Sequence, residues 1–248
     1  MKKILTIIIL SAVLLYSVWL YRDANALVIM GGYYGGGGCA VTSCGVDPDI
    51  ACDTLEGSDA IFTLSGTDRW SFASAARGSC SDDYWIVTNP IPNDYQYHNF
   101  VDSDPTYADF WFRIVSTDMA NTEGLDIAAL QTDEEYACIY LSVINASGTY
   151  NLYSRLVNGG SPSNTYEISL NTWYHVGMMF DAAANTAAWF ASTVDALGAA
   201  QESFSELATP RTPGIFKIGN ITDIGAFDIV INYDSVGLDD DTMTGVEY

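Results

Sequence analysis

Three segments of this 248-residue chain place aromatic and arginine side chains at every second position, opposite aliphatic ones. Flat aromatic rings stack on sugar rings, and the arginine fork pairs with carboxylate or hydroxyl oxygens. If the three segments lie side by side, these side chains form a surface suited to a glycan, including an acidic one. The alternative is that they pack under loops or against a second sheet. The candidate ligand-binding residues are Trp111, Arg113, Tyr140, Tyr153 and Arg155.

The period of two residues in these segments is typical of a β-strand with one buried face. In residues 107–115, Phe110, Phe112 and Ile114 share one side, opposite Trp111 and Arg113. Residues 136–143 and 150–157 divide in the same way. The aliphatic sides of all three segments therefore face a core. The aliphatic positions of the second and third segments are Ala137, Ile139, Leu141, Val143, Leu152 and Leu156.

The stretch from Thr172 to Asp195 predicts two apolar strands joined by a short turn, with Asn185 in a left-handed conformation. Residues 78–109 are rich in turn signals, and 201–207 is the best helix candidate. Almost no other helical periodicity is present, so we expect an all-β, antiparallel β-sandwich with little helix. Further strands are expected at residues 60–65, 69–75, 84–87, 166–170, 215–218 and 226–233.

The composition is that of a folded and very acidic domain. Hydrophobic residues make up 49% of the chain, and the formal net charge is -22. Without residues 1–26, six basic and 30 acidic side chains remain, a net charge of -24, and Lys217 is the one lysine left. Phosphate backbones would be repelled, so we expect no nucleic-acid partner.

The N-terminus has the order of a secretory signal. Lys2 and Lys3 precede an apolar run, and the small residues Ala24 and Ala26 end it, which predicts cleavage after Ala26. The alternative is a retained membrane anchor. We divide the chain into a signal peptide (1–26), a Gly- and Cys-rich leader (27–58) and one β-sandwich domain (59–248), and we expect it to be secreted or at the cell surface.

All five cysteines lie in the exported part. In an oxidising compartment the first four can form two disulfides, for which three pairings are open, and Cys39 with Cys44 and Cys52 with Cys80 is our choice. The spacings do not match those of zinc sites. Cys138, in the apolar segment YACIYL, is expected to be a buried thiol.

Several short motifs resemble the concanavalin A-like, laminin G-like jelly-roll superfamily. These are NTWYHV (171–176), followed by MFD (179–181), then FKIG (216–219) and INYDSVGL (231–238). The similarity covers roughly residues 107–238. One departure is Ala196 after Asp195, where the family often has a glycine.

This resemblance implies two curved sheets, with ligands on the concave one or on its rim loops. The five candidate residues would converge if their strands lie on that sheet. It also implies one structural calcium ion, with Asp234 as a ligand. The alternative for the nearby Asp239, Asp240 and Asp241 is a solvated acidic tail.

Catalysis is not indicated. Glycosidases need two facing carboxylates, but Glu134 and Glu135 are adjacent and point to opposite sides of a strand. Lyases of similar fold use His and Tyr, yet the motifs around His98 and His175 are different from theirs. We expect His175 to be a satisfied histidine of the sheet. No nucleophile elbow or phosphate loop is present.

The sequence therefore favours an exported, non-catalytic module that binds carbohydrate or another surface polymer. The alternative is a structural subunit of an appendage, filament or virion that self-associates, and a polysaccharide lyase is third. A membrane is a partner only if the N-terminal segment is retained.

Overall fold

A computed structural model of the chain describes residues 51–53, 62–65, 69–74, 83–101, 104–132, 137–156, 164–194, 197–205 and 211–239. The chain divides into two units, Met1–Val41 and Thr42–Tyr248, and all described residues lie in the second. The predicted signal peptide, most of the leader, and Cys39, Cys44 and Cys80 lie outside the described residues. Within the described ranges, no helix is long and apolar enough to cross a membrane.

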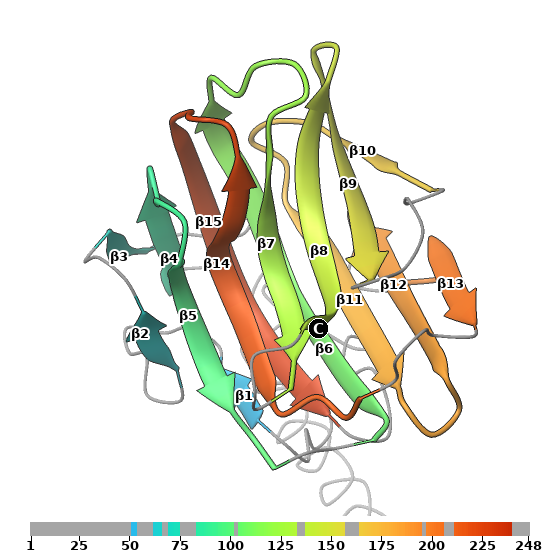
Figure 1. Cartoon of the computed structure of the whole chain (residues 1–248). Helices are drawn as coiled ribbons and strands as arrows, with labels where there is room; N and C mark the ends of the chain where they lie inside the picture. The colour runs from blue at the N-terminus through green and yellow to red at the C-terminus, as the bar shows by residue number, and fades with distance from the viewer. Residues whose placement is uncertain are drawn as a thin grey trace, which may run out of the picture. The chain divides into compact units, whose positions relative to one another are not determined.

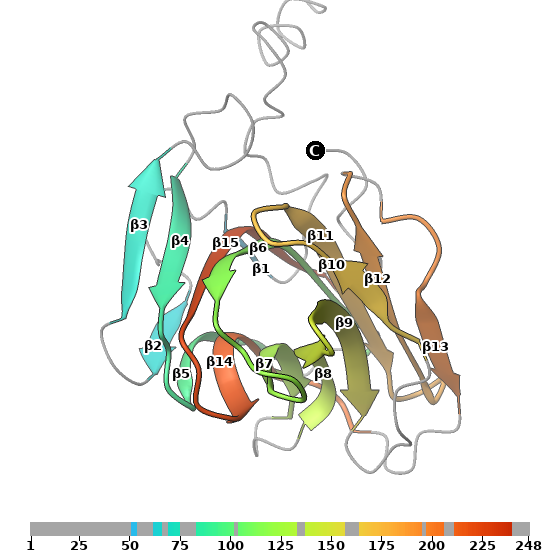
Figure 2. The ribbon, with the colours of Figure 1, turned by 90° about the horizontal axis from the view of Figure 1, so that it is seen from above.

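The described strands form two antiparallel sheets that lie face to face (Figures 1 and 2). In the eight-stranded sheet the order is β13 (Glu202–Ser205), β12 (Thr186–Ser192), β11 (Tyr174–Asp181), β6 (Thr106–Thr117), β15 (Ile229–Asp239), β4 (Asp83–Thr88) and β3 (Trp70–Ser74), and β1 (Ala51–Asp53) also pairs with β15. In the seven-stranded sheet it is β10 (Tyr166–Ile168), β9 (Thr149–Leu156), β8 (Ala137–Ala146), β7 (Gly124–Gln131), β14 (Ile215–Ile224), β5 (Asp94–Asn99) and β2 (Thr63–Ser65).

The core fills the space between the two sheets, as the period of two predicts. Phe110 and Phe112 of β6 are fully buried there, and so are Ile139 and Leu141 of β8. Aromatic rings from both sheets meet in this core: Phe110 of β6 lies 6.0 Å from Phe216 of β14 between ring centroids. The expected antiparallel β-sandwich is confirmed, and its strands have the aliphatic faces that the sequence indicates.

The hairpin predicted from Thr172 to Asp195 is confirmed as β11 and β12. Its strands pair from His175 with Ser192 to Asp181 with Thr186. Asn185 has φ 58, the left-handed conformation expected of it, and its backbone N–H donates to the carbonyl oxygen of Ala182. This hairpin lies beside β6, because β11 also pairs with β6.

Three expectations differ from the structure. The helix predicted at 201–207 is wrong, because Glu202–Ser205 forms the edge strand β13. Its backbone groups form hydrogen bonds with β12 instead of with a helical turn. The loop-rich interval contains a second strand, β5. Ala51–Asp53, which we assigned to the leader, pairs as β1 with β15 and so belongs to the sandwich.

Candidate functional site

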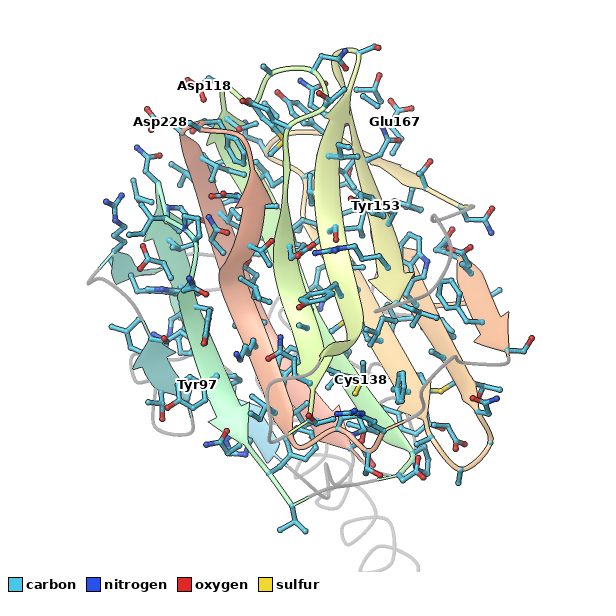
Figure 3. All side chains as sticks on the ribbon, in the orientation of Figure 1. Tyr97, Asp118, Cys138, Tyr153, Glu167 and Asp228 are labelled. Atoms are coloured by element: carbon cyan, nitrogen blue, oxygen red, sulfur yellow. The ribbon has the colours of Figure 1, made fainter. Side chains whose placement is uncertain are left out.

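The face of the seven-stranded sheet turned away from the core carries a cluster of tyrosine and polar side chains. We call this cluster the tyrosine face. Its side chains alternate along their strands with the buried core residues, and Figure 3 labels Tyr97 and Tyr153 toward its two sides. The tyrosine face consists of Tyr95 and Tyr97 on β5, Lys217 on β14, Asp126, Ala129 and Gln131 on β7, Tyr140 and Ser142 on β8, and Tyr153 and Arg155 on β9.

The strand registers align these residues in a row across the sheet. Arg155 pairs with Tyr140, Tyr140 with Ala129, Ala129 with Lys217, and Lys217 with Tyr97. Neighbouring strands lie about 4.8 Å apart, so the four steps from β9 to β5 span about 19 Å. Ala129 is fully buried at the centre of the row. A small residue thus lies between larger side chains on both sides.

An ion pair joins β9 to β7. The guanidinium of Arg155 donates from Nη2 to Asp126 Oδ2 and from Nε to Asp126 Oδ1, the second bond being 3.2 Å long. Ser142 donates its hydroxyl to the same Oδ1 at 2.5 Å. The hydrogen bond to Asp126 raises the pKa of Arg155. Asp126 therefore accepts three charge-assisted hydrogen bonds, two of them from the guanidinium.

Tyr140 and Tyr153 lie on either side of this ion pair. The guanidinium carbon of Arg155 lies 4.6 Å from the ring centroid of Tyr140, a cation–π contact. Partial burial raises the pKa of both phenols, and the negative charge of Asp126 raises it further. The side chains of Gln131 and Ser142 lower the pKa of Tyr140 and Tyr153, respectively, but by less than burial raises it. Both phenols are consequently neutral at neutral pH.

A second cation contacts a tyrosine on the other side of the row. The ammonium of Lys217 donates to the phenol oxygen of Tyr95 at 3.0 Å and lies 4.3 Å from that ring's centroid. Tyr95 contacts Tyr97 edge to face, with 6.1 Å between centroids. Lys217 is only 4% exposed, so its charge lies beneath the surrounding side chains.

The polar residues of the tyrosine face are buried, whereas part of the aromatic surface is exposed. Asp126, Gln131 and Ser142 are each less than 5% exposed. Tyr97, Tyr140 and Tyr153 are half-buried. The Oε1 atom of Gln131 is buried without a hydrogen-bond partner among the described residues. The rings, and not these buried polar atoms, therefore form the surface that a ligand would contact.

Of the five candidate residues, the structure brings three together and separates two. Tyr140, Tyr153 and Arg155 lie on the tyrosine face, but Trp111 and Arg113 lie on β6 in the eight-stranded sheet. The expected convergence of all five on one face is wrong. The alternation along a strand predicts on which side of the strand a side chain lies, but it does not predict which sheet the strand joins. The binding role of each residue stays a prediction.

Trp111 and Arg113 have structural contacts in their own sheet. The Trp111 ring stacks on the His175 ring, with 4.9 Å between centroids and an interplanar angle of 7°. His175 is fully buried, and its Nε2 lies 2.9 Å from Asp109 Oδ2. The guanidinium of Arg113 lies 4.7 Å from the Trp173 ring centroid. The expectation of a satisfied sheet histidine at His175 agrees with this geometry.

Asp234 lies on β15, where it pairs in register with Trp111. It is 3% exposed. Across the described ranges, no group of three His, Cys, Asp or Glu side chains is arranged to hold a metal ion. Asp234 as a calcium ligand therefore stays a prediction, like the disulfides of Cys39, Cys44, Cys52 and Cys80.

Several residues of the tyrosine face do not follow from the sequence pattern. Asp126 and Gln131 lie on β7, whose eight residues are all buried, so no alternation of apolar and polar residues reveals the strand. Tyr95 and Tyr97 alternate with Gln96 and His98, a signal that turn residues on either side obscure. Lys217 could have been noticed as the one lysine after residue 26.

No protein-family model and no curated protein sequence matches the chain. Many solved structures are similar to it, among them the three described next. A sialidase has a TM-score of 0.54 and 10% identity over 81% of this chain and 19% of its own. A bifunctional GH43-CE protein from Bacteroides eggerthii has a TM-score of 0.51 and 12% identity over 77% of this chain and 26% of its own. The cellulose-induced protein Cip1 has a TM-score of 0.53 and 10% identity over 76% of this chain and 96% of its own.

This chain thus spans about a fifth of the sialidase and about a quarter of the GH43-CE protein, but nearly all of Cip1. At these identities the likeness concerns the fold. Three observations agree on the fold: the two antiparallel sheets, the hairpin that carries NTWYHV, and these similar structures. The chain has the concanavalin A-like jelly-roll fold.

Proposed function

We propose that this protein is an exported, non-catalytic jelly-roll module that binds carbohydrate through the tyrosine face. The observation that carries the proposal is the pairing of half-buried tyrosine rings with the partly exposed guanidinium of Arg155 on one side of a sheet. A sugar ring has apolar faces and hydroxyl groups at its edge, so it needs both kinds of contact. Tyr140 and Tyr153 offer the rings, and Arg155, whose side chain is 42% exposed, offers N–H donors beside them.

The rigidity of the tyrosine face supports a binding role. The ion pair with Asp126 and the cation–π contact with Tyr140 restrain Arg155, and the cation–π contact also restrains the Tyr140 ring. Because these side chains are ordered before a ligand arrives, binding costs less conformational entropy. All of them project from strands, which hold positions more firmly than loops do.

The chemistry of the tyrosine face supports binding rather than catalysis. The chain has two histidines, and neither lies on this face: His175 is on the eight-stranded sheet, and His98 contacts the core residue Phe62. The raised pKa of Tyr140 and Tyr153 keeps them protonated at neutral pH, so neither is a ready general base. A lyase that uses a tyrosine base is therefore the weaker alternative.

The comparisons agree with a carbohydrate ligand without assigning one. Two similar structures carry names that concern carbohydrate, a sialidase and a cellulose-induced protein. A shared fold does not transfer function, so this is support by analogy. Secretion rests on the N-terminal signal sequence, and the structural calcium ion at Asp234 stays part of the proposal.

The proposal predicts that Tyr140→Ala and Tyr153→Ala each weaken binding to glycans by about tenfold, the effect of losing one ring contact. Affinity gel electrophoresis with a panel of soluble polysaccharides measures this loss. The melting temperature should change little, because both side chains are only half-buried. The matched control is Tyr107→Ala, a half-buried tyrosine on β6 in the other sheet.

Two outcomes would contradict the proposal. One is that the wild-type protein binds no polysaccharide of the panel; the other is that Tyr107→Ala weakens binding as much as Tyr140→Ala does. Long polymers that grow with protein concentration under the electron microscope, without any glycan binding, would instead favour the structural subunit.

A further inference from the structure

We propose that the tyrosine face selects uncharged glycans and discriminates against polyuronates, because Asp126 neutralises its arginine internally. This inference rests on the proposed function and names the ligand class of the same face. It differs from what the arginine alone suggests, since a free guanidinium fork would favour a carboxylate. The contacts of Arg155, Lys217 and Gln131 carry the argument.

Asp126 already occupies Arg155 in the manner of a ligand carboxylate. Its two oxygens accept from Nη2 and Nε, which is a forked pairing. A uronate could bind only the N–H groups that Asp126 leaves, and Asp126 already offsets the positive charge that would attract the uronate. To take the edge of the guanidinium that Asp126 occupies, the uronate would have to displace the Asp126 carboxylate. That carboxylate is 4% exposed and would keep only Ser142 as a hydrogen-bond donor among the described contacts. Leaving a buried carboxylate without its cation is strongly unfavourable.

The second cation of the face is also engaged. Lys217 donates to the Tyr95 phenol and lies over the Tyr95 ring. At 4% exposure it offers little surface to a ligand from solution. A carboxylate on the half-buried rings would therefore find both cations already in contact with protein groups, Arg155 with Asp126 and Lys217 with Tyr95.

A second buried oxygen adds negative partial charge to this face. Gln131 Oε1 has no hydrogen-bond partner among the described residues, so no donor offsets its partial charge there. A carboxylate on the rings would place negative charge near this oxygen and near Asp126. A neutral sugar would not, so both oxygens disfavour an acidic ligand.

The charge of the whole chain acts in the same direction. Residues 27–248 carry a net charge of -24, so a polyanion is repelled at long range and most strongly at low salt. The local contacts and the overall field therefore both disfavour polyuronates.

The test compares each neutral polysaccharide with its own carboxylated form, so that shape and linkage are constant. Isothermal titration calorimetry with glucan, mannan and xylan identifies the neutral ligand, and the bound glucan or mannan is then oxidised at C6 to the uronate. The wild-type protein should bind the oxidised form at least about tenfold more weakly. Alginate and polygalacturonate extend the comparison to natural polyuronates.

Asp126→Asn gives a gain-of-function test, because it keeps the shape of the side chain and releases the charge of Arg155. The variant should bind the oxidised glycan about tenfold more tightly than the wild type does, and added salt should remove the gain. The matched control is Asp228→Asn, which changes the net charge equally at an exposed loop position (Figure 3). This control should show no gain.

The outcomes separate the inference from the proposed function. Wild-type protein that binds the oxidised form as tightly as the neutral form overturns the inference alone, and so does a folded Asp126→Asn variant without any gain. If Asp126→Asn does not fold, the wild-type comparison still decides. Absence of binding to every neutral and acidic glycan overturns the proposed function and this inference with it.

Discussion

At the scale of single residues, three phenols are held neutral by their surroundings. Burial raises the pKa of Tyr140 and Tyr153 above 10.0, and the charge of Asp126 adds to the effect. Tyr233 is fully buried in the core, donates to the carbonyl oxygen of Ile127 at 3.2 Å, and has a pKa raised well above its ordinary value. In the unfolded chain all three phenols ionise near pH 10.

This difference predicts that the protein loses stability in alkaline solution. A pKa raised in the folded state gives stability that is fully present below the unfolded pKa of about 10 and is lost as pH rises toward the folded value. The free energy of unfolding, measured by urea denaturation at several pH values, should fall above pH of about 10. Tyr233→Phe removes the most buried phenol and should reduce the slope of that fall; an unchanged slope would contradict the assignment.

The sequence predicts the side of a strand better than it predicts the partners of a residue. Alternation correctly places Tyr140, Tyr153 and Arg155 opposite the aliphatic residues of their strands. It does not distinguish them from Trp111, which lies on the other sheet and stacks on His175. The order of strands within each sheet depends on long-range pairing, which no local pattern contains. The ion pair of Arg155 with Asp126 is therefore not predictable from spacing.

At the scale of secondary-structure elements, strands with one buried face are the predictable ones. β6, β8 and β11 follow the period of two, because one side faces the core. β7 lies between β8 and β14 and is buried on both sides, so its sequence GLDIAALQ shows no alternation. The short edge strand β13 lacks a strong pattern, which explains why 201–207 resembles a helical turn.

An irregularity in β14 is a sensitive point of the seven-stranded sheet. The register with β7 shifts between Ile218 and Thr222, and Gly219 within this bulge has φ +126. A Cβ added there would lie 2.7 Å from the Asp94 carbonyl oxygen and 2.8 Å from Tyr95 Cα. Such approaches are closer than van der Waals contact, and this backbone conformation is essentially restricted to glycine.

Gly219→Ala should therefore lower the free energy of unfolding by about 2–4 kcal/mol. The matched control is Gly198→Ala, at φ +70 with no heavy atom within 4 Å of the added carbon, which should cost only about 1 kcal/mol. Chemical denaturation of both variants measures the difference. Equal losses in the free energy of unfolding would show that the backbone conformation alone, and not the close packing of β14 against β5, makes a side chain at position 219 unfavourable.

At the scale of the whole molecule, charge and ligand chemistry are linked. The chain is strongly acidic, yet the one lysine after residue 26 and one of its few arginines lie on the tyrosine face. Each cation contacts a tyrosine ring, and Arg155 also offsets Asp126. The charges of Arg155, Lys217 and Asp126 thus sum to only +1 on this face of an acidic protein. An uncharged polymer can approach it without electrostatic repulsion.

Export makes a prediction about the covalent state of the whole chain. Cleavage after Ala26 in an oxidising compartment should give a mature protein that begins at Leu27 with two disulfides. Cys138 is buried, and its thiol donates to the carbonyl oxygen of Arg211 at 3.3 Å, so we expect it to remain a thiol. Intact mass spectrometry of the secreted protein, alkylated after denaturation, should show one added group without reductant and five with it. The cysteines expected to be paired are Cys39, Cys44, Cys52 and Cys80.

The control for this experiment is the same protein made in a reducing cytoplasm without residues 1–26, which should take up five groups in both conditions. Three groups on the unreduced secreted protein would leave one disulfide. Five would leave none, and the prediction of two disulfides would then be wrong. A mass that still includes residues 1–26 would instead indicate a retained anchor, and the tyrosine face would then lie near a membrane surface.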